Sequence, residues 1–312
     1  MKGDTMEKKR VGFLGPVNTF SYLAAQQVYR EEKYEIIPFW PLSYVLDALW
    51  QGRVDEIMVP IENALAGEVV AVIDYIIARL LEGGNFFYIT KEFFLPIKHC
   101  LIGQGGVALG SIKKVLSKGE ALAQCLNIIR KYDWEMIETV STANAVEKVA
   151  QSKDRNIAAI ASDNALANYN LEIIQNNIGD SQDNITRFIV LSKEQALPSG
   201  KDKTTIFFII EDKSGALCDI LLAFKERQIN LSQIARRPSR NGFGKYVFWI
   251  EAQGHVKSSI LLKEALDDVK RIALSFWVIG SYPDRAELLN ALPLQPKGVD
   301  VHFTKIPTKG WT

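Results

Sequence analysis

The residues of this chain that could act on a small molecule are mostly neutral hydrogen-bond donors, and they gather in short loops. Four loops place such donors where a predicted strand feeds into a predicted helix: residues 15–21, 60–64, 117–120 and 141–144. A helix N-terminus offers unpaired N–H groups and the positive end of a dipole, so it favours a carboxylate or a phosphate. Any one loop is explained as well by an N-cap that serves only its helix. Four together favour an anion-binding cleft.

A fifth segment, residues 183–191, is a polar loop that runs directly into an apolar strand. Thr186 and Arg187 stand where this loop meets the predicted strand. Thr has a high β-propensity and Arg is readily solvated at a strand end. Taken alone, this segment is better explained as the start of a strand than as a site.

Residues suited to metals and redox cofactors are sparse. The three histidines lie far apart, and no H-E-x-x-H motif occurs. His99 and Cys100 stand in an apolar strand, which favours a packed core role over catalysis. Residues 103–108 resemble a dinucleotide-binding fingerprint, but another strand follows them instead of a long helix. The cysteines at 100, 125 and 218 form no C-x-x-C pair, which fits a reducing cytoplasm. We expect no metal and no other cofactor.

The composition is that of a globular protein with two domains. The 312 residues are 47% hydrophobic and 23% charged, and 37 Lys and Arg offset 36 Asp and Glu to a net charge of +1. A near-neutral chain lacks the electrostatic footprint of a protein whose main partner is nucleic acid or an anionic membrane. No apolar run approaches the ~18–20 residues of a membrane span, and residues 11–20 are too short and polar for a signal-peptide core. We expect a cytoplasmic protein.

The hydrophobic pattern predicts an α/β chain with two parts. In the first part, apolar runs predict strands near 10–14, 56–61, 95–102, 114–116, 156–161 and 187–191, and helical spacing predicts helices near 21–30, 42–49, 69–80, 120–131 and 143–151. This alternation indicates an α/β domain with a largely parallel sheet. Residues 192–203 have the composition of a linker. A β-α-β-β-α-β order follows over 204–280, which is the ferredoxin-like arrangement.

Six short motifs stand in a fixed order along the chain. They are G-P-V-N-T-F-S (15–21), P-I-E-N-A (60–64), S-K-G-E-A-L-A-Q-C (117–125), T-R-F (186–188), G-A-L-C (215–218) and N-L-S-Q-I-A-R-R-P (230–238). Together they resemble the prephenate dehydratase family with a C-terminal ACT regulatory domain, over about residues 10–282. The resemblance implies a two-lobed, periplasmic-binding-protein-like catalytic domain over 8–195, a linker over 196–203, an ACT domain over 204–284 and a tail over 285–312.

The resemblance also implies an activity, that of a carbon–oxygen lyase in L-phenylalanine biosynthesis. Such an enzyme converts prephenate, a dicarboxylate, to phenylpyruvate with loss of water and carbon dioxide. In the family the threonine of T-R-F protonates the departing hydroxyl, which implies that Thr186 is a general acid. Arg187 and Glu62 are implied as further catalytic residues. The implied substrate-binding residues are Thr19, Ser21, Asn63, Ser117, Gln124 and Phe188.

For the second domain the resemblance implies L-phenylalanine as an effector and a homodimer or homotetramer as the assembly. The implied effector residues are Gly215, Ala216, Leu217, Asn230, Leu231, Arg237 and Pro238. Four departures from the family pattern stand in these motifs. Asn18 replaces a glycine, Ala64 replaces a serine, K-G-E over 118–120 replaces H-P-Q, and Ala235-Arg236 replaces Glu-Ser.

Three alternatives remain open at this point. A prephenate decarboxylase would remove carbon dioxide without expelling the hydroxyl, although related proteins of that kind typically lack the threonine at 186. An arogenate dehydratase would act on the amino-acid counterpart of prephenate. A non-catalytic amino-acid sensor would use both domains for ligand binding alone.

Overall fold

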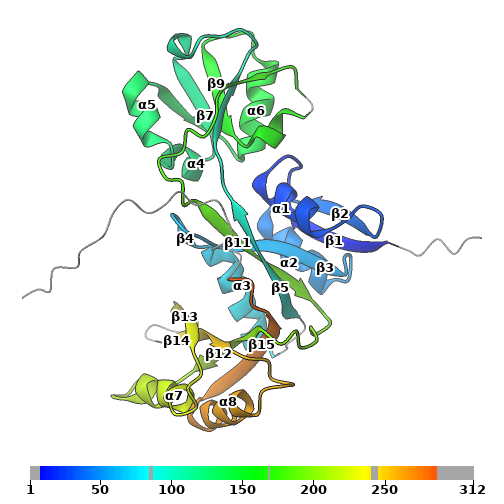
Figure 1. Cartoon of the computed structure of the whole chain (residues 1–312), viewed down its shortest axis with the longest axis vertical. Helices are drawn as coiled ribbons and strands as arrows, with labels where there is room; N and C mark the ends of the chain where they lie inside the picture. The colour runs from blue at the N-terminus through cyan, green and yellow to red at the C-terminus, as the bar shows by residue number, and fades with distance from the viewer. Residues whose placement is uncertain (1–7, 84–86, 168, 240–244, 287–312) are drawn as a thin grey trace, which may run out of the picture.

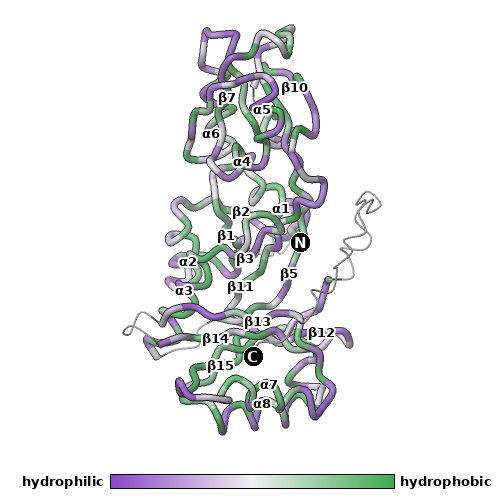
Figure 2. The backbone as a smooth tube through the Cα atoms, turned by 90° about the vertical axis from the view of Figure 1, so that its left-hand side faces the viewer, coloured by the Kyte–Doolittle hydropathy of each residue, from purple (hydrophilic) through white to green (hydrophobic). Residues whose placement is uncertain are grey.

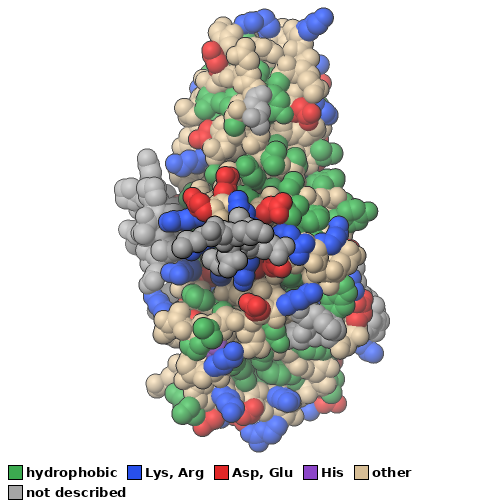
Figure 3. Space-filling model, turned by 90° about the vertical axis from the view of Figure 1, so that its right-hand side faces the viewer, with side chains coloured by type: hydrophobic (Ala, Val, Ile, Leu, Met, Phe, Trp, Pro, Cys, Tyr) green, Lys and Arg blue, Asp and Glu red, His purple; other side chains and the backbone are tan. Residues whose placement is uncertain are grey.

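The computed structural model describes residues 8–83, 87–167, 169–239 and 245–286. Three units lie along its long axis: a first lobe in the middle, a second lobe at the top and a C-terminal unit at the bottom (Figure 1). Most of the predicted tail, residues 287–312, lies outside the described residues. Within the described part of the chain, no helix has the length and apolar character to cross a bilayer. Acidic and basic side chains intermix on the face seen in Figure 3, as the net charge of +1 suggests.

The first lobe is a mixed sheet built from both ends of the segment 9–192. Its strands run in the order β2 (Tyr34–Phe39), β1 (Lys9–Leu14), β3 (Glu56–Asn63), β11 (Ile185–Ser192) and β5 (Tyr88–Pro96), and the short β4 (Gly67–Glu68) pairs with β3. β1 is parallel to β2 and β3, whereas β11 is antiparallel to β3 and β5. The expectation of a largely parallel sheet is therefore wrong here. The chain leaves this lobe through β5 and returns through β11, which reverses the direction.

Three helices cover the two faces of this sheet. Helix α1 (Phe20–Val28) packs on one face, where Phe13, Met58 and Phe188 are buried. Helices α2 (Leu42–Trp50) and α3 (Val70–Leu81) pack on the other face, where Ile57 and Ile189 are buried. Successive residues of a strand point to opposite faces, so each residue's place in β11 fixes the side on which its side chain lies.

The second lobe has its own mixed sheet, in the order β10 (Glu172–Gln175), β6 (Cys100–Gly103), β9 (Ile157–Ala161), β7 (Lys114–Ser117) and β8 (Glu135–Glu138). Helices α4 (Gly119–Ala123), α5 (Leu126–Tyr132) and α6 (Thr142–Gln151) pack on it. Two predicted elements are split. The strand expected over 95–102 becomes β5 and β6, because residues 97–99 cross between the lobes. The helix expected over 120–131 is interrupted at residues 124–125.

The C-terminal unit has the β-α-β-β-α-β order predicted from the sequence. It comprises β12 (Asp202–Ile209), α7 (Ala216–Lys225), β13 (Leu231–Pro238), β14 (Tyr246–Gln253), α8 (Ile260–Ile272) and β15 (Ser275–Pro283). The strand order β13-β14-β12-β15 is antiparallel throughout. β12 begins at Asp202, inside the segment 196–203 that was predicted to be a linker.

The C-terminal sheet is covered on both faces. Helices α7 and α8 lie on one side, and α3 of the first lobe lies on the other (Figure 2). Phe207, Trp249 and Ile279 belong to the same buried cluster as Ile73 of α3 and Ile89 of β5. The first lobe and the C-terminal unit therefore share one hydrophobic core, and their relative placement is set by side-chain packing.

Candidate functional site

A cleft of about 650 Å³ lies between the two lobes. Thr19, Ser21, Asn63 and Thr186 line it from the first lobe, and Gln124 lines it from the second. Apolar side chains complete the wall, with Phe20, Trp40, Leu42, Pro60, Val70 and Phe188 among them. A pocket with an apolar wall and a few convergent polar groups is typical of a small-molecule site.

Side chains along β11 point alternately to its two faces, and this alternation determines which residues of T-R-F reach the cleft. Thr186 and Phe188 share one side of the strand, and both line the cleft. Arg187 points to the opposite side, where its guanidinium meets Glu92 and Glu251. On the neighbouring strand, Ile61 is the extra residue of a β-bulge, since Arg187 pairs with Glu62 but Phe188 pairs with Pro60. The bulge places Asn63 on the cleft side, together with Pro60.

Asn63 is the hydrogen-bond partner of Thr186. The Asn63 Oδ1 accepts hydrogen bonds from the backbone N–H of Leu65 (3.0 Å) and of Ala66 (2.9 Å), so the orientation of the amide is fixed. Its Nδ2 therefore faces Thr186 and donates to the Thr186 Oγ1 at 2.9 Å. Because the hydroxyl oxygen accepts this bond, the hydroxyl hydrogen remains available for a group in the cleft.

The same amide continues a chain of hydrogen bonds toward the second lobe. Asn63 Nδ2 also donates to Asn184 Oδ1 (2.8 Å), and Asn184 Nδ2 donates to Gln124 Oε1 (2.8 Å). His99 Nε2 lies 2.8 Å from that same Gln124 oxygen and must donate to it. Burial lowers the pKa of His99, and the hydrogen bond with Gln124 only partly offsets this. His99 is therefore a neutral donor at the base of the cleft.

Two helix N-termini from different lobes open onto the cleft. Thr19 caps α1 by accepting from the backbone N–H of Tyr22 (3.3 Å), and Ser141 caps α6 by accepting from that of Asn144 (3.0 Å). Both capping residues line the cleft. The capping role and the cleft role therefore coincide, and both helices present the positive ends of their dipoles.

The K-G-E departure places an ion pair at the cleft wall. Lys118 Nζ lies 3.0 Å from Glu120 Oε1, and both residues line the cleft. Burial alone would raise the pKa of the Glu120 carboxyl, but the hydrogen bond and charge of Lys118 more than offset this and the pKa is lowered. The opposite charges of this ion pair cancel, so the segment adds no net charge beside the cleft.

Three residues expected at the site lie elsewhere. Ser117 is fully buried in the second sheet, where its hydroxyl donates to the carbonyl of Ile160. Glu62 is on the side of β3 away from the cleft, 3.9 Å from Arg187 Nη1. Arg187 is buried between the first lobe and the C-terminal unit. Strand alternation, the β-bulge and the burial of the end of β7 keep these three side chains out of the cleft lining, contrary to the place expected for them.

Several residues of the cleft were not predicted to belong to it. Asn184 stands within the segment 183–191 that was singled out, yet its polar side chain was given no role. His99 was expected in the core, but it lines the cleft, and so does Trp40, for which the sequence analysis named no role. The positions of His99 and Asn184 in the chain could have indicated this role, because His99 lies just after β5 and Asn184 just before β11, on the two crossings between the lobes.

The residues expected to bind an effector separate into two groups. Gly215 precedes α7 with φ of +84°, Ala216 and Leu217 begin that helix, and Asn230 and Leu231 stand at the start of β13. Arg237 and Pro238 end β13, about 23 Å farther along the strand. There the Arg237 Nε contacts Asp74 Oδ1 of α3 at 3.1 Å, and Pro238 borders a cavity of about 250 Å³ beside that helix.

Comparison with known proteins agrees with this architecture. The family model described as prephenate dehydratase matches residues 11–196. Prephenate dehydratase of Bacillus subtilis is 32% identical, covering 88% of this chain and 98% of that protein. The Methanocaldococcus jannaschii prephenate dehydratase is 38% identical, covering 72% and 80%. The crystal structure of the Arthrobacter aurescens prephenate dehydratase in complex with L-Phe superposes with a TM-score of 0.79 at 33% identity, covering 88% of this chain and 90% of that one. This chain belongs to the prephenate dehydratase family.

Proposed function

We propose that this protein is a lyase that converts prephenate to phenylpyruvate, carbon dioxide and water in the cleft between its two lobes. The observation that carries the proposal is the placement of Thr186. Its hydroxyl faces the cleft, and its oxygen accepts a hydrogen bond from the Asn63 amide, whose orientation is fixed by backbone N–H groups. This is the arrangement that a hydroxyl general acid needs.

The reaction is a loss of the ring carboxylate coupled to loss of the ring hydroxyl. The bond between the ring and the carboxylate breaks, and its electron pair enters the ring as carbon dioxide leaves. The carbon–oxygen bond to the hydroxyl breaks at the same time, and Thr186 gives that oxygen the proton with which it leaves as water. One proton is consumed per turnover, and solvent returns it to Thr186. A hydroxyl is a very weak acid, so we expect proton transfer and bond cleavage to be concerted.

Asn63 supports this step by stabilising the charge that develops on the Thr186 oxygen. The amide N–H already lies 2.9 Å from that oxygen, so little reorganisation is needed when negative charge builds up. The neutral amide chain through Asn184 and Gln124 holds Asn63 in place. The role of Asn63 is thus to make an unreactive alcohol a better proton donor.

The rest of the cleft suits a dicarboxylate with a non-aromatic ring. The N-termini of α1 and α6 offer N–H donors for carboxylates from two sides. Apolar side chains such as Phe20 and Trp40 provide a surface for the ring. Neutral donors and helix dipoles supply the attraction for the dianion, because the opposite charges of the Lys118–Glu120 pair in the cleft wall cancel.

Turnover of prephenate by the purified full-length protein tests the proposal. Wild type should form phenylpyruvate, and Thr186→Val should reduce kcat by about 10²-fold or more, because the isosteric side chain lacks the proton. Thr90→Val is the matched control: Thr90 is a buried threonine of the adjacent strand β5, outside the cleft lining, and its variant should keep wild-type kcat. A Thr186→Val protein with wild-type kcat would overturn the assignment.

The product and the ligand response separate the alternatives. A hydroxylated, non-aromatic product would identify a prephenate decarboxylase. Faster turnover of arogenate than of prephenate would identify an arogenate dehydratase. A thermal shift with amino acids and no product from either compound would identify a sensor. Each outcome contradicts the proposal in a different way.

We infer further that residues 204–284 form an ACT regulatory domain that binds L-phenylalanine, and that residues 8–195 form the catalytic domain. The β-α-β-β-α-β topology and the bound L-Phe of the Arthrobacter aurescens relative support this inference. Because the expected effector residues lie at two ends of β13, we propose that a second copy of the chain completes the site in a homodimer or homotetramer. L-Phenylalanine should lower the rate and alter the mass seen by light scattering, whereas L-tyrosine should do neither.

A further inference from the structure

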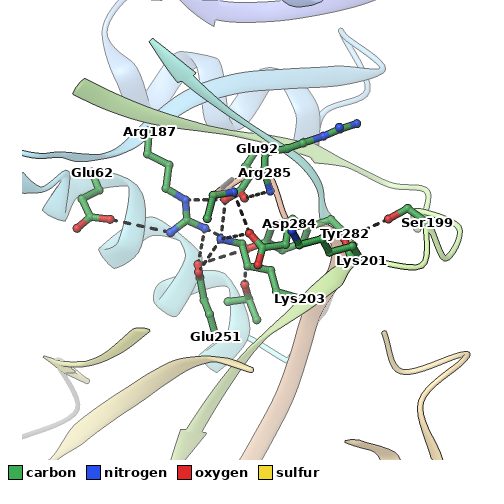
Figure 4. Close-up of polar contacts among 12 residues, drawn as sticks. Glu62, Glu92, Arg187, Ser199, Lys201, Lys203, Glu251, Tyr282, Asp284 and Arg285 are labelled. Atoms are coloured by element: carbon green, nitrogen blue, oxygen red, sulfur yellow. Dashed lines mark hydrogen bonds and ion pairs between the residues drawn. The ribbon is translucent and has the colours of Figure 1, made fainter. Parts of the chain in front are cut away.

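Five side chains form a buried ionic cluster between the first lobe and the C-terminal unit, outside the cleft. They are Arg187 of β11, Glu92 of β5, Lys203 of β12, Glu251 of β14 and Tyr282 of β15, called here the Arg187 cluster (Figure 4). All five residues are buried, and Arg187, the most accessible of them, is 7% exposed. Two cations face two carboxylates within this cluster, and the carboxylates of Glu62 and Asp284 lie at its margins, each 3.9 Å from one of the cations. The buried charges are thus compensated inside the protein.

Arg187 joins the two units through two different nitrogens. Its Nε donates to Glu92 Oε2 at 2.9 Å, within the first lobe. Its Nη2 donates to Glu251 Oε1 at 2.6 Å and to Tyr282 Oη at 3.2 Å, both in the C-terminal unit. Burial opposes the charge, yet Tyr282, Glu251 and Glu92 raise the pKa of Arg187 above its usual range. The planar guanidinium is therefore held as a charged fork that spans the junction between the units.

Lys203 contacts the same two carboxylates but from a different strand. Its Nζ lies 2.7 Å from Glu92 Oε2 and 3.2 Å from Glu251 Oε2. Lys203 and Arg187 thus have the same charge, similar burial and two carboxylate partners in common. Lys203 also lies 3.9 Å from Asp284 Oδ1, whereas Arg187 also donates to Tyr282 Oη. They differ in their strands, since Lys203 is in the C-terminal unit whereas Arg187 directly follows Thr186 in β11.

We propose that Arg187 is a positioning residue for Thr186, and that the C-terminal unit completes the active site by holding Arg187 through Glu251. Adjacent residues of one strand share a rigid peptide unit, so the place of the Arg187 side chain on one face constrains Thr186 on the other. Thr186 pairs with Asn63 on one side and Leu95 on the other, which leaves little freedom except displacement of the whole strand end. This inference rests on the proposed function of Thr186.

The proposal gives the C-terminal unit a part in catalysis as well as in regulation. A movement of β14 relative to β5 would change the distance between Glu251 and Glu92, the two carboxylates that Arg187 bridges. Because the guanidinium bonds to both, it would have to release one of them or shift with the strand. Either change would reach Thr186 without passing through the cleft.

Kinetics of full-length variants on prephenate test the proposal. Arg187→Lys keeps the positive charge but loses the planar guanidinium that bonds to both carboxylates. It should lower kcat about tenfold or more and change KM less than about twofold. The effect falls on kcat because misplacement of a reacting group acts on the chemical step. Glu251→Gln, which alters only the C-terminal unit, should lower kcat in the same way. The variant that combines Arg187→Lys and Glu251→Gln should have the same kcat as Arg187→Lys alone, since both changes break the same contact between Arg187 and Glu251.

Lys203→Met is the matched control. It removes the other cation of the Arg187 cluster and should lower the thermal midpoint at least as much as Arg187→Lys, yet keep kcat within about twofold of wild type. Assays are run well below the unfolding midpoint of every variant. Equal kcat losses in Lys203→Met and Arg187→Lys would reduce the cluster to a stabilising role and overturn the proposal, as would an unchanged kcat in Arg187→Lys or Glu251→Gln.

Hydrogen exchange of the peptide that covers 184–190 supplies a readout without substrate. Arg187→Lys and Glu251→Gln should speed amide exchange at the start of β11, whereas Lys203→Met should not. If wild type fails to turn over prephenate, the proposed function is wrong, and this exchange pattern alone then decides whether Arg187 and Glu251 hold β11. Wild-type exchange in both variants would overturn the proposal in either case.

Discussion

Asn63 Nδ2 and Thr186 Oγ1 lie 2.9 Å apart on paired strands of the first lobe, at the edge of the cleft. Two backbone N–H groups of the following turn hold the Asn63 oxygen, so its nitrogen side faces the threonine. The direction of this hydrogen bond determines that Thr186 can give its own proton to a ligand.

Reversing that polarity should suppress turnover. In Asn63→Asp the new carboxylate keeps the acceptor for the two backbone N–H groups but can only accept from Thr186. The hydroxyl would then donate to the carboxylate instead of the substrate, and kcat should fall about 10- to 100-fold, the range expected for a hydrogen bond to a charged group. Steady-state kinetics measure this effect. Asn177→Asp, outside the cleft lining, is the control, and equal rates in the two variants would contradict the mechanism.

The first loop depends on Asn18, which departs from the family glycine. Asn18 has φ of +65°, in the left-handed region that Asn tolerates better than most residues. Asn18→Ala should therefore lower the free energy of unfolding by about 1 kcal/mol, whereas Asn18→Gly should change it by less. Urea denaturation measures both values. Equal stability of the alanine and glycine variants would show that the positive φ carries no cost.

The junction between β15 and β5 should tolerate no side chain at residue 280. A Cβ on Gly280 would overlap the backbone carbonyl oxygen of Ile89, which cannot move without parting the two units. Gly280→Ala should cost about 2 kcal/mol or more of stability. At Gly110, a Cβ would meet nothing within 4 Å, so Gly110→Ala is the control and should be nearly neutral. Calorimetry of both variants decides, and equal melting temperatures would refute the close approach.

His99 should titrate below its ordinary value of 6.5, because burial lowers the pKa of its imidazole. The unfolded chain then binds the proton more readily than the folded one, so stability falls as the pH drops through 6.5 toward the lowered pKa. NMR titration resolves the ring protons of the three histidines. Urea midpoints at about pH 5 and about pH 8 should differ less in His99→Gln than in wild type. A His99 midpoint above 6.5 would contradict the burial effect.

Much of the fold follows from periodicity, and the misses have physical causes. The apolar stripe of residues 69–80 predicts α3 to within a residue at each end. β2 was not predicted because Glu35 and Pro38 interrupt its apolar pattern. The predicted helix over 120–131 breaks at Gln124, where the backbone carbonyl instead accepts from the N–H of Asp180, a contact remote in sequence. Such tertiary partners override local preference.

The site was predictable where strand alternation alone decides it. Period 2 along β11 places Thr186 and Phe188 together and Arg187 opposite them, although the sequence analysis grouped all three at the site. The place of Asn63 depends on a bulge at Ile61, and the burial of Ser117 depends on Ile160 of a neighbouring strand. Glu251, which pairs with Arg187, lies 64 residues away. No local pattern in the sequence identifies these partners.

The hydrophobic core shared by α3, β5 and the C-terminal sheet bears on how such proteins can be recombined. The C-terminal unit contributes side chains such as Phe207 and Trp249 to this core, and the first lobe contributes side chains such as Ile73 and Ile89. In a chimaera that exchanged residues 202–283 for those of a relative, the new C-terminal sheet would have to pack against α3 and β5 side chains that are adapted to the original sheet. The chimaera would need compensating changes on α3 and β5, so the two units are expected to be inherited as one piece.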